Sequence, residues 1–350
     1  MNGNKDKCKL RDFCFAADEN YTMPLRVCVA SLLWSMRKNF RQVNIHVLDL
    51  GISDSCWSSL VDSWQLLLCR IGQRRDSVAF CRCAVEKSMF DGMMPWHGSV
   101  ATYARLLLPK ILPDVKWCLY SDSDVLFVES PIELDFYCGD PRISVLGHKN
   151  PPWCDKIDGK WFHDNGLEFN PKTHICAGLL LMNLELFRQQ DLSAKAFGFL
   201  RTHKTTASAD QSAINHVCAS SLRLLPHRWG IFCGELENRA DDGIGGGGAI
   251  HYADGAPWKP PVNCTMLLGL NPAVADIWRR FAVEVAGVDP SSVKPRFMQM
   301  MNVRVRACIV WCLLLASKIC FFKVRRYEDW PGRNITRETV KAYEKLLFAD

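Results

Sequence analysis

Short apolar runs alternate with amphipathic segments along most of the chain. Runs typical of buried strands occur at residues 13–17, 43–49, 78–85, 143–147 and 175–184. Between them, apolar positions recur with helical spacing at 27–34 and 55–68, and residues 97–106 and 209–215 each open a further helical segment. This alternation predicts an α/β fold with a mostly parallel sheet covered by helices.

The most informative stretch is residues 117–127, where two apolar runs enclose Asp122 and Asp124. The first run predicts a buried strand that ends at Asp122, and ligands bind at such strand ends in open α/β sheets. Residues i and i+2 of extended backbone point to the same side, so both carboxylates can approach one Mg²⁺ or Mn²⁺ ion. A polar turn, or a phosphohydrolase with an aspartate nucleophile, fits the same pattern when it is judged alone.

The first strand leads into a polar loop that holds Asp18, Asn20 and Tyr21. No Gly-x-Gly-x-x-Gly fingerprint follows, which argues against a dinucleotide fold of the usual kind. The carboxylate, amide and phenol of this loop can bind uracil and ribose, although Asp18 or Asn20 can equally cap the following helix. Later, His251 follows the glycine-rich residues 243–248 and is a candidate ligand.

Two further segments are candidates for ligand contacts. Residues 148–171 are rich in Trp, Asp, Asn and Gly and predict an irregular segment of a kind that often carries substrate contacts. The strand at 175–184 has small residues near its start, where a larger side chain would block the approach of a ligand.

Composition narrows the class of protein only slightly. The chain has 350 residues and a net charge of +6, which is too modest to call for a nucleic-acid partner. Its 17 cysteines show no Cys-x-x-Cys pair and no regular disulfide spacing, and no secretory signal follows the polar start. These features predict a reduced, cytoplasmic protein.

Taken together, the polar blocks resemble glycosyltransferase family 8, most closely its bacterial lipopolysaccharide galactosyl- and glucosyltransferases. The resemblance rests on blocks that occur in the family's order: residues 15–21, 46–49, 51–53, 102–106, 119–126, 177–184, 210–211 and 251–252. It implies a GT-A fold, Rossmann-like with flanking helices, and transfer of galactose or glucose from a UDP-sugar to a surface-glycan acceptor. The phosphohydrolase alternative explains none of the other blocks.

The resemblance also implies a site. Asp122, Asp124 and His251 would hold Mn²⁺ or Mg²⁺, which stabilises the leaving UDP as a Lewis acid. The remaining nucleotide-sugar contacts would come from Ala16, Asp18, Asn20, Tyr21, His97, Arg105, Asp122, Ser123, Cys176, Ala177, Gly178, Asp210, Gly255 and Lys259.

The family retains the anomeric configuration of the sugar, and Asp210 and Gln211 are the implied catalytic pair. Asp210 would bind sugar hydroxyls, whereas Gln211 would lie on the sugar face opposite the leaving group. Because a neutral amide is a poor nucleophile, we favour front-face attack by the acceptor hydroxyl over double displacement.

Two positions depart from the family pattern. Cys176 stands where the family usually has an asparagine that contacts the donor sugar, and a thiol forms only weak hydrogen bonds. No lysine precedes Pro257 and Trp258, so Lys259 would supply the cation that binds the diphosphate. A catalytically weak nucleotide-sugar-binding protein at the membrane is therefore the alternative function.

The C-terminal part has a character of its own. An apolar run at residues 307–322 is flanked by arginine and lysine and is short for a membrane span. It predicts a helix that lies on an anionic membrane surface, with a helix packed on the main domain as the alternative. We therefore expect a catalytic domain at 10–285 and a basic, apolar tail at 286–350, peripheral at the inner face of the plasma membrane, where a lipid-linked acceptor would be available.

Overall fold

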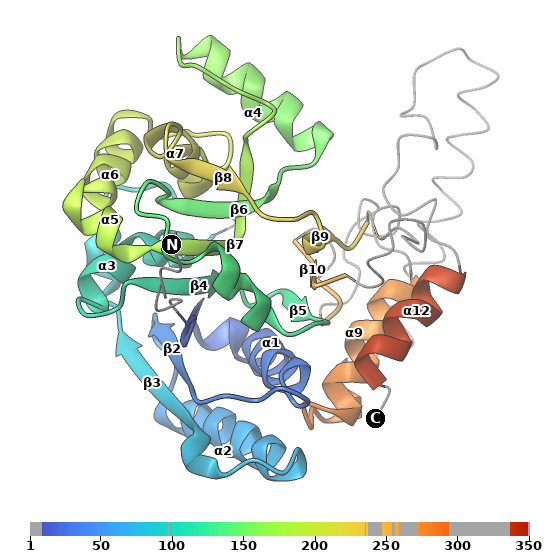
Figure 1. The fold of residues 1–350 in the computed structure, drawn as a ribbon. Coiled ribbons are helices and arrows are strands. Elements are labelled where there is room, and N and C mark those ends of the chain that lie inside the picture. The colour runs from blue at the N-terminus through green and yellow to red at the C-terminus, as the bar shows by residue number, and fades with distance from the viewer. Residues whose placement is uncertain are drawn as a thin grey trace, which may run out of the picture.

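A seven-stranded sheet forms the centre of the protein (Figure 1). The computed structural model describes residues 9–96, 98–234, 236, 247–253, 256–258, 272–293 and 337–348. In spatial order the strands are β3 (Val78–Ala84), β2 (Val43–Asp49), β1 (Asp12–Ala17), β4 (Trp117–Ser121), β7 (Ile175–Asn183), β6 (Val145–Lys149) and β8 (Leu222–Leu224). Neighbouring strands are parallel except at β7, which runs antiparallel to β4 and β6. The predicted α/β fold with a mostly parallel sheet is confirmed.

The central strands are apolar on both faces because helices cover both sides of the sheet. In β1, Phe13 and Phe15 belong to the core on one face, whereas Cys14 belongs to the core on the other. All nine residues of β7 are buried. The continuous apolar runs of the sequence therefore correspond to strands with no solvent-exposed face.

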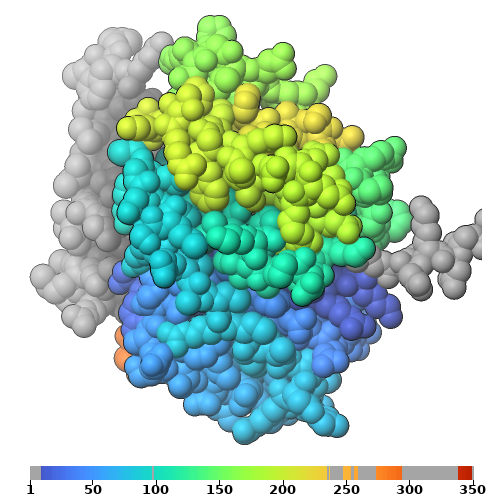
Figure 2. Space-filling view, turned by 90° about the vertical axis from the view of Figure 1, so that its left-hand side faces the viewer, coloured from blue at the N-terminus to red at the C-terminus, as the bar shows by residue number. Residues whose placement is uncertain are grey.

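The helices form the two outer layers. On the face of Phe13 the core includes residues of α1 (Thr22–Ser35) and α2 (Asp54–Arg70). On the opposite face lie residues of η4 (Ala101–Leu107), α3 (Leu108–Ile111), α5 (Leu184–Gln189), α6 (Leu192–Thr202) and α7 (Ala209–Val217). Figure 2 views the molecule from this second side, where the yellow-green residues of α5 and α6 form an outer layer.

A small second sheet extends the first beyond the aspartate pair. Its order is β5 (Val125–Phe127), β10 (Ala249–His251) and β9 (Trp229–Phe232). β10 pairs antiparallel with β5, so that His251 lies opposite Val125. The amide of Tyr252 donates to the carbonyl of Asp124 over 2.9 Å. This pairing carries a histidine from late in the chain to the end of β4.

The described residues near the C-terminus pack on the same domain. They are α9 (Pro272–Glu284), α10 (Pro290–Val293) and α12 (Arg337–Phe348), and α9 and α12 lie side by side (Figure 1). Tyr343 and Leu347 belong to the core next to α1, and the indole of Trp34 donates to the carbonyl of Leu347 over 2.6 Å. The apolar run at 307–322, predicted as a membrane-surface helix, lies outside the described residues.

Most predicted strands are observed within two residues of their expected ends, and Val43–Asp49 matches fully. The segment predicted to be irregular is different: it contains the 13-residue helix α4 (Pro152–Asp164). Short 3₁₀ turns fill other connections, namely η1 (Glu19–Tyr21), η2 (Arg75–Ser77), η3 (Lys87–Phe90) and η5 (Pro131–Tyr137). In the part of the chain that the structure describes, no helix is both long and apolar enough to cross a membrane.

Candidate active site

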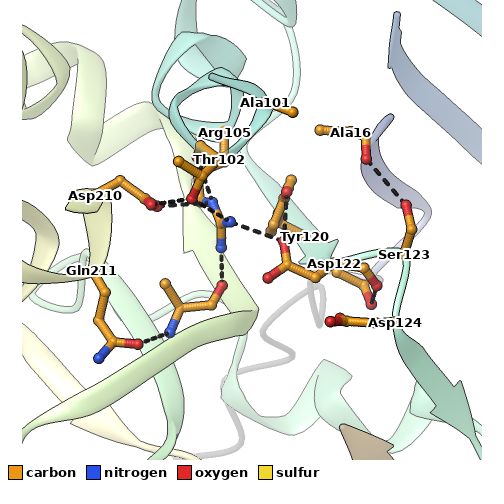
Figure 3. Close-up of polar contacts among 12 residues, drawn as sticks. Ala16, Ala101, Thr102, Arg105, Tyr120, Asp122, Ser123, Asp124, Asp210 and Gln211 are labelled. Carbon is orange, nitrogen blue, oxygen red and sulfur yellow. Dashed lines mark hydrogen bonds and ion pairs between the residues drawn. The ribbon is translucent and has the colours of Figure 1, made fainter. Parts of the chain in front are cut away.

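The chain turns sharply where β4 ends, and this turn presents the aspartate pair. The amide of Asp122 donates to the carbonyl of Gly178 over 2.8 Å, which fixes the turn to the start of β7. The hydroxyl of Ser123 donates to the carbonyl of Ala16 over 3.0 Å, which fixes it to β1 (Figure 3). Three strands thus hold the backbone of the Asp-Ser-Asp turn, as expected for a ligand-binding edge of an α/β sheet.

Asp122, Asp124 and His251 form a group that can hold a metal ion. One potential ligand atom from each side chain lies within 4.8 Å of the other two. His251 Nε2 is 3.2 Å from Asp124 Oδ1, and this buried oxygen accepts no hydrogen bond of good geometry from the described residues. Two carboxylates and an imidazole suit Mn²⁺, and a buried oxygen without a hydrogen bond is satisfied by a cation.

Arg105 is the buried cation that links the two acidic positions of the site. Its Nη2 donates to Asp122 Oδ1 over 2.8 Å, and its Nε lies 2.9 Å from Asp210 Oδ2 (Figure 3). The guanidinium also donates to the carbonyl of Ala177 and lies over the ring of Tyr120, 4.4 Å from its centroid. Arg105 therefore links the end of β4 and the start of β7 to the first turn of α7.

The electrostatics of this group follow from its burial. Burial raises the pKa of Asp122 to about 6; Arg105 opposes this shift and the neighbouring Asp124 adds to it. Burial alone would lower the pKa of Arg105, but Asp122 and Asp210 raise it above its ordinary value. Asp122 and Asp124 repel each other when both are ionised, so a bound cation would stabilise the doubly ionised pair.

Asp210 and Gln211 occupy the first turn of α7. Asp210 is buried and accepts a hydrogen bond from the hydroxyl of Thr102. Gln211 Oε1 accepts from the amide of Ala177 over 3.0 Å, and its Nε2 donates to Asp158 Oδ2 over 3.2 Å. Both ends of the Gln211 amide are therefore engaged, which fixes its orientation beside the start of β7.

Asp158 is a site residue that the sequence analysis did not identify. It lies on α4, inside the segment predicted to be irregular, and is almost fully buried. The hydroxyl of Ser208 donates to its Oδ1 over 2.6 Å, and burial raises the pKa of its carboxyl. An isolated Asp in a Trp- and Lys-containing stretch offers no motif by which it could have been found.

The residues expected to bind uridine lie at the end of β1. Asp18 accepts a hydrogen bond from the amide of Asn20 over 2.9 Å, so one carboxylate oxygen acts as the helix cap that the sequence allowed. Tyr21 packs edge-on against Trp258, with ring centroids 6.2 Å apart. Burial, followed by the charges of Asp124, Asp122 and Asp18, raises the pKa of Tyr21.

Cys176 lies next to the metal-site histidine. Its Sγ is 3.8 Å from His251 Nδ1, on the opposite side of the ring from the nitrogen that faces Asp124. The ring of His148, which the sequence analysis did not single out, is also close to His251, with centroids 5.8 Å apart. Three of the predicted contact residues, His97, Gly255 and Lys259, lie outside the described residues.

Comparison with models of protein families identifies the family of this chain. The model of glycosyl transferase family 8 matches residues 13–260, which include every site residue described above. The chain belongs to this family. The carboxylate–histidine group lies within the matched region.

The individual relatives of this chain have low sequence identity to it. A Haemophilus influenzae protein whose name marks it as a glycosyltransferase not yet confirmed is 22% identical over 222 residues, or 61% of each chain. The chain thus matches less than two thirds of that relative's length.

Solved structures of glycosyltransferases share the fold of this chain. The galactosyltransferase LgtC, in complex with donor and acceptor sugar analogues, is 21% identical with a TM-score of 0.63, and the match covers 80% of this chain and 98% of LgtC. The bifunctional glycosyltransferase WbbM is 17% identical with a TM-score of 0.62, covering 87% of this chain and 53% of WbbM. At these identities the likeness establishes the GT-A fold.

Proposed function

We propose that the protein transfers a hexose, galactose or glucose, from a UDP-sugar to a lipopolysaccharide or other surface-glycan acceptor, with metal dependence and retention of configuration. The observation that carries this proposal is the convergence of Asp122, Asp124 and His251 beside the Arg105–Asp210 pair. A cation site at a strand edge, next to buried polar groups, suits a nucleotide diphosphate whose charge grows as the sugar departs.

Asp122, Asp124 and His251 would hold the Mn²⁺ or Mg²⁺ ion. When bound, the ion would neutralise the charge that develops on the departing diphosphate. Arg105 keeps Asp122 in position through its 2.8 Å hydrogen bond. The second sheet keeps His251 next to Asp124 through the pairing of β10 with β5.

The donor would lie across the carboxyl edge of the sheet. Ala16, Asp18, Asn20 and Tyr21 would contact uridine at the end of β1. The sugar would lie near the start of β7, within reach of the following residues: Arg105, Ser123, Cys176, Ala177, Gly178 and Asp210. His97, Gly255 and Lys259 remain proposed contacts of the diphosphate or the acceptor on the basis of the sequence alone.

Retention would proceed by front-face attack of the acceptor hydroxyl. The hydrogen bonds of Gln211 to Ala177 and Asp158 hold a neutral amide in one orientation. The dipole of an amide carbonyl held in this way stabilises positive charge on the sugar. Double displacement would instead need this amide to attack the sugar, and a neutral amide is a poor nucleophile.

The acceptor would be a glycan, and a lipid-linked one would place the enzyme at the membrane. We propose that the basic, apolar residues 304–326 attach the protein to an anionic surface. Sedimentation with phosphatidylglycerol-containing vesicles, compared with phosphatidylcholine vesicles, tests this attachment. Equal sedimentation with both would contradict it.

UDP release from a panel of UDP-sugars in the presence of Mn²⁺ tests the function. We expect release from UDP-galactose or UDP-glucose, and its loss on addition of a chelator or in the Asp124→Asn variant. Asp76→Asn is the matched control because Asp76 is exposed and its partner in the described residues is the exposed Arg74. Its release should equal that of the natural protein.

Two other outcomes would point elsewhere. UDP binding without release, with and without glycan acceptors, would support the alternative of a catalytically weak nucleotide-sugar-binding protein. Release of phosphate from a phosphomonoester, with no requirement for a UDP-sugar, would support a phosphohydrolase. Either result contradicts the proposed transfer reaction.

A further inference from the structure

A second group of potential metal ligands lies directly behind the carboxylate site. It consists of His148, Cys176 and His251, whose ligand atoms lie within 4.8 Å of one another. All three side chains are buried, with 2%, 6% and 3% of their surface exposed. The proposed hexose transfer assigns no role to His148 and only a weak sugar contact to Cys176. This group is therefore unexplained by the reaction.

Within the part of the chain that the structure describes, the hydrogen bonding of His148 leaves one ring nitrogen without a partner. Its Nδ1 lies 3.2 Å from the carbonyl of Lys149, an acceptor, so the proton of a neutral ring belongs on Nδ1. Nε2 then carries a lone pair, and it is fully buried with no hydrogen-bond partner among the described residues. An imidazole whose Nδ1–H donates to a backbone carbonyl is the usual state of a histidine that ligates a metal through Nε2.

The packing around both imidazoles fixes their positions. Phe232 contacts the ring of each, with centroids 5.2 Å from His148 and 5.1 Å from His251. A Cβ atom at Gly230, which has a φ of +98°, would lie 2.2 Å from Cδ2 of His148. The chain therefore has glycine where the ring of His148 must approach the backbone.

The distances suit a thiophilic ion. Cys176 Sγ and His251 Nδ1 are 3.8 Å apart. With Zn–S near 2.3 Å and Zn–N near 2.0–2.1 Å, two ligands of a tetrahedral Zn²⁺ are about 3.6 Å apart. A thiolate and two imidazoles are donors that strongly favour zinc over manganese, whereas carboxylates are ligands that also suit manganese.

We propose that His148 Nε2, Cys176 Sγ and His251 Nδ1 form a second cation site, selective for Zn²⁺, that shares His251 with the carboxylate site. Binding releases the thiol proton of Cys176 to solvent, because the thiolate is the ligating form. The side chain of Asp122 is 30% exposed, so the carboxylate site that shares His251 with this group is open to solvent.

Sharing His251 couples the two sites. Its Nε2 faces Asp124 and its Nδ1 faces Cys176. A neutral imidazole has one lone pair, so Zn²⁺ on Nδ1 leaves a proton on Nε2, which then donates to Asp124. The carboxylate site thereby loses its nitrogen ligand. Zn²⁺ at the second site therefore weakens Mn²⁺ binding. Weaker Mn²⁺ binding inhibits hexose transfer, and this last step rests on the proposed function.

Cobalt substitution tests the site without reference to activity. The full chain is treated with a chelator and titrated with Co²⁺, whose thiolate charge-transfer absorption reports a cysteine ligand. We expect one equivalent of this absorption, displaced by Zn²⁺ and absent in Cys176→Ser. The His148→Gln variant should bind Co²⁺ at least about tenfold more weakly. Persistence of the full absorption in Cys176→Ser would overturn the proposal.

Cys218→Ser is the matched control because Cys218 is equally buried but lies at the end of α7, outside the group. It should retain the absorption in full. If Cys176→Ser does not fold, X-ray absorption at the zinc edge of the natural protein decides the question. One sulfur and two nitrogen ligands are expected, and a shell of oxygen and nitrogen alone would overturn the site.

The effect on the carboxylate site has a separate readout. Mn²⁺ affinity, followed by electron paramagnetic resonance, should fall more with one equivalent of Zn²⁺ in the natural protein than in Cys176→Ser, where Zn²⁺ acts only by direct competition for the carboxylate site. If Co²⁺ and Zn²⁺ bind as expected but no UDP-sugar is turned over, the cation site stands and only the proposed transfer fails. Simultaneous binding of both metals at full affinity would refute the coupling.

Discussion

Gly178 makes room for His251. A Cβ atom at Gly178 would lie 2.2 Å from Cε1 of His251 and 2.6 Å from its Nε2, so only glycine lets the ring lie against the start of β7. From the sequence, the small residues here predict the close approach of a ligand. In the structure the space at Gly178 is filled by a side chain of the candidate metal site.

Gly178→Ala should therefore weaken metal binding without removing a ligand. The added methyl group displaces the His251 ring from Asp124, and we expect Mn²⁺ affinity to fall by about tenfold or more, in the range of changes that reorient a ligand. Electron paramagnetic resonance of free Mn²⁺ measures this. Gly198→Ala, in α6 with open space at its Cβ position, is the control. Equal affinity in both variants would contradict the role of Gly178.

Arg105 should contribute strongly to stability. Arg105→Met leaves Asp122 and Asp210 without their shared cation, and removing one partner from a buried ion pair costs about 3–5 kcal/mol of unfolding free energy. Arg105→Lys should recover part of this loss, because an ammonium group keeps the charge but not the planar fork. Urea unfolding measures both variants.

Arg74→Met provides the comparison for Arg105. Arg74 pairs with Asp76 at the surface, where 83% and 65% of the two side chains are exposed. An exposed, solvent-screened pair contributes little to stability, so this variant should unfold almost as the natural protein does. Similar losses in Arg74→Met and Arg105→Met would show that the buried arrangement has no special role.

How much of the site could be predicted depended on whether a residue belongs to a motif. Asp122 and Asp124 follow a buried apolar run, and a strand end is readable from one chain segment. Placing His251 beside them needed the resemblance to a family, because the pairing of β10 with β5 joins segments more than a hundred residues apart. Local patterns contain no information on such pairing.

His148 and Asp158 are site residues that could not be predicted from the sequence. His148 lies inside strand β6, one residue before its end, and its importance arises only from its contact with His251 across the fold. Asp158 lies in helix α4, which the sequence analysis missed because aromatic, glycine and charged residues obscure its periodicity. Pro151 and Pro152 stand at the start of this helix, where proline is favoured.

Gln211 should assist catalysis without being a nucleophile. Gln211→Ala removes the oriented amide, and we expect turnover to fall by about 10²–10³-fold, as on loss of one electrostatic contact in other active sites. Donor affinity should change little, and the product should keep its anomeric configuration. Single-turnover kinetics with nuclear magnetic resonance of the product measure these quantities. Complete loss of turnover with intact UDP-sugar binding would favour double displacement through this position.

Asp158 should make stability depend on pH in a predictable direction. Burial raises its pKa in the folded protein, so the folded state binds this proton more tightly than the unfolded state does. Its contribution to stability is then fully present below the unfolded pKa and is lost as the pH rises through the folded pKa. We expect the free energy of unfolding of the natural protein, relative to Asp158→Asn, to decrease from about pH 4 to pH 7.

Urea unfolding at several pH values measures this difference, and Asp76→Asn gives a control of opposite sign. The hydrogen bond from Arg74 lowers the pKa of Asp76, so its small contribution is present above the unfolded pKa and is lost as the pH falls. A relative stability of Asp158→Asn that does not change with pH would mean that Asp158 has the same pKa in both states. Its buried hydrogen bonds to Ser208 and Gln211 would then offset the whole cost of burying its charge.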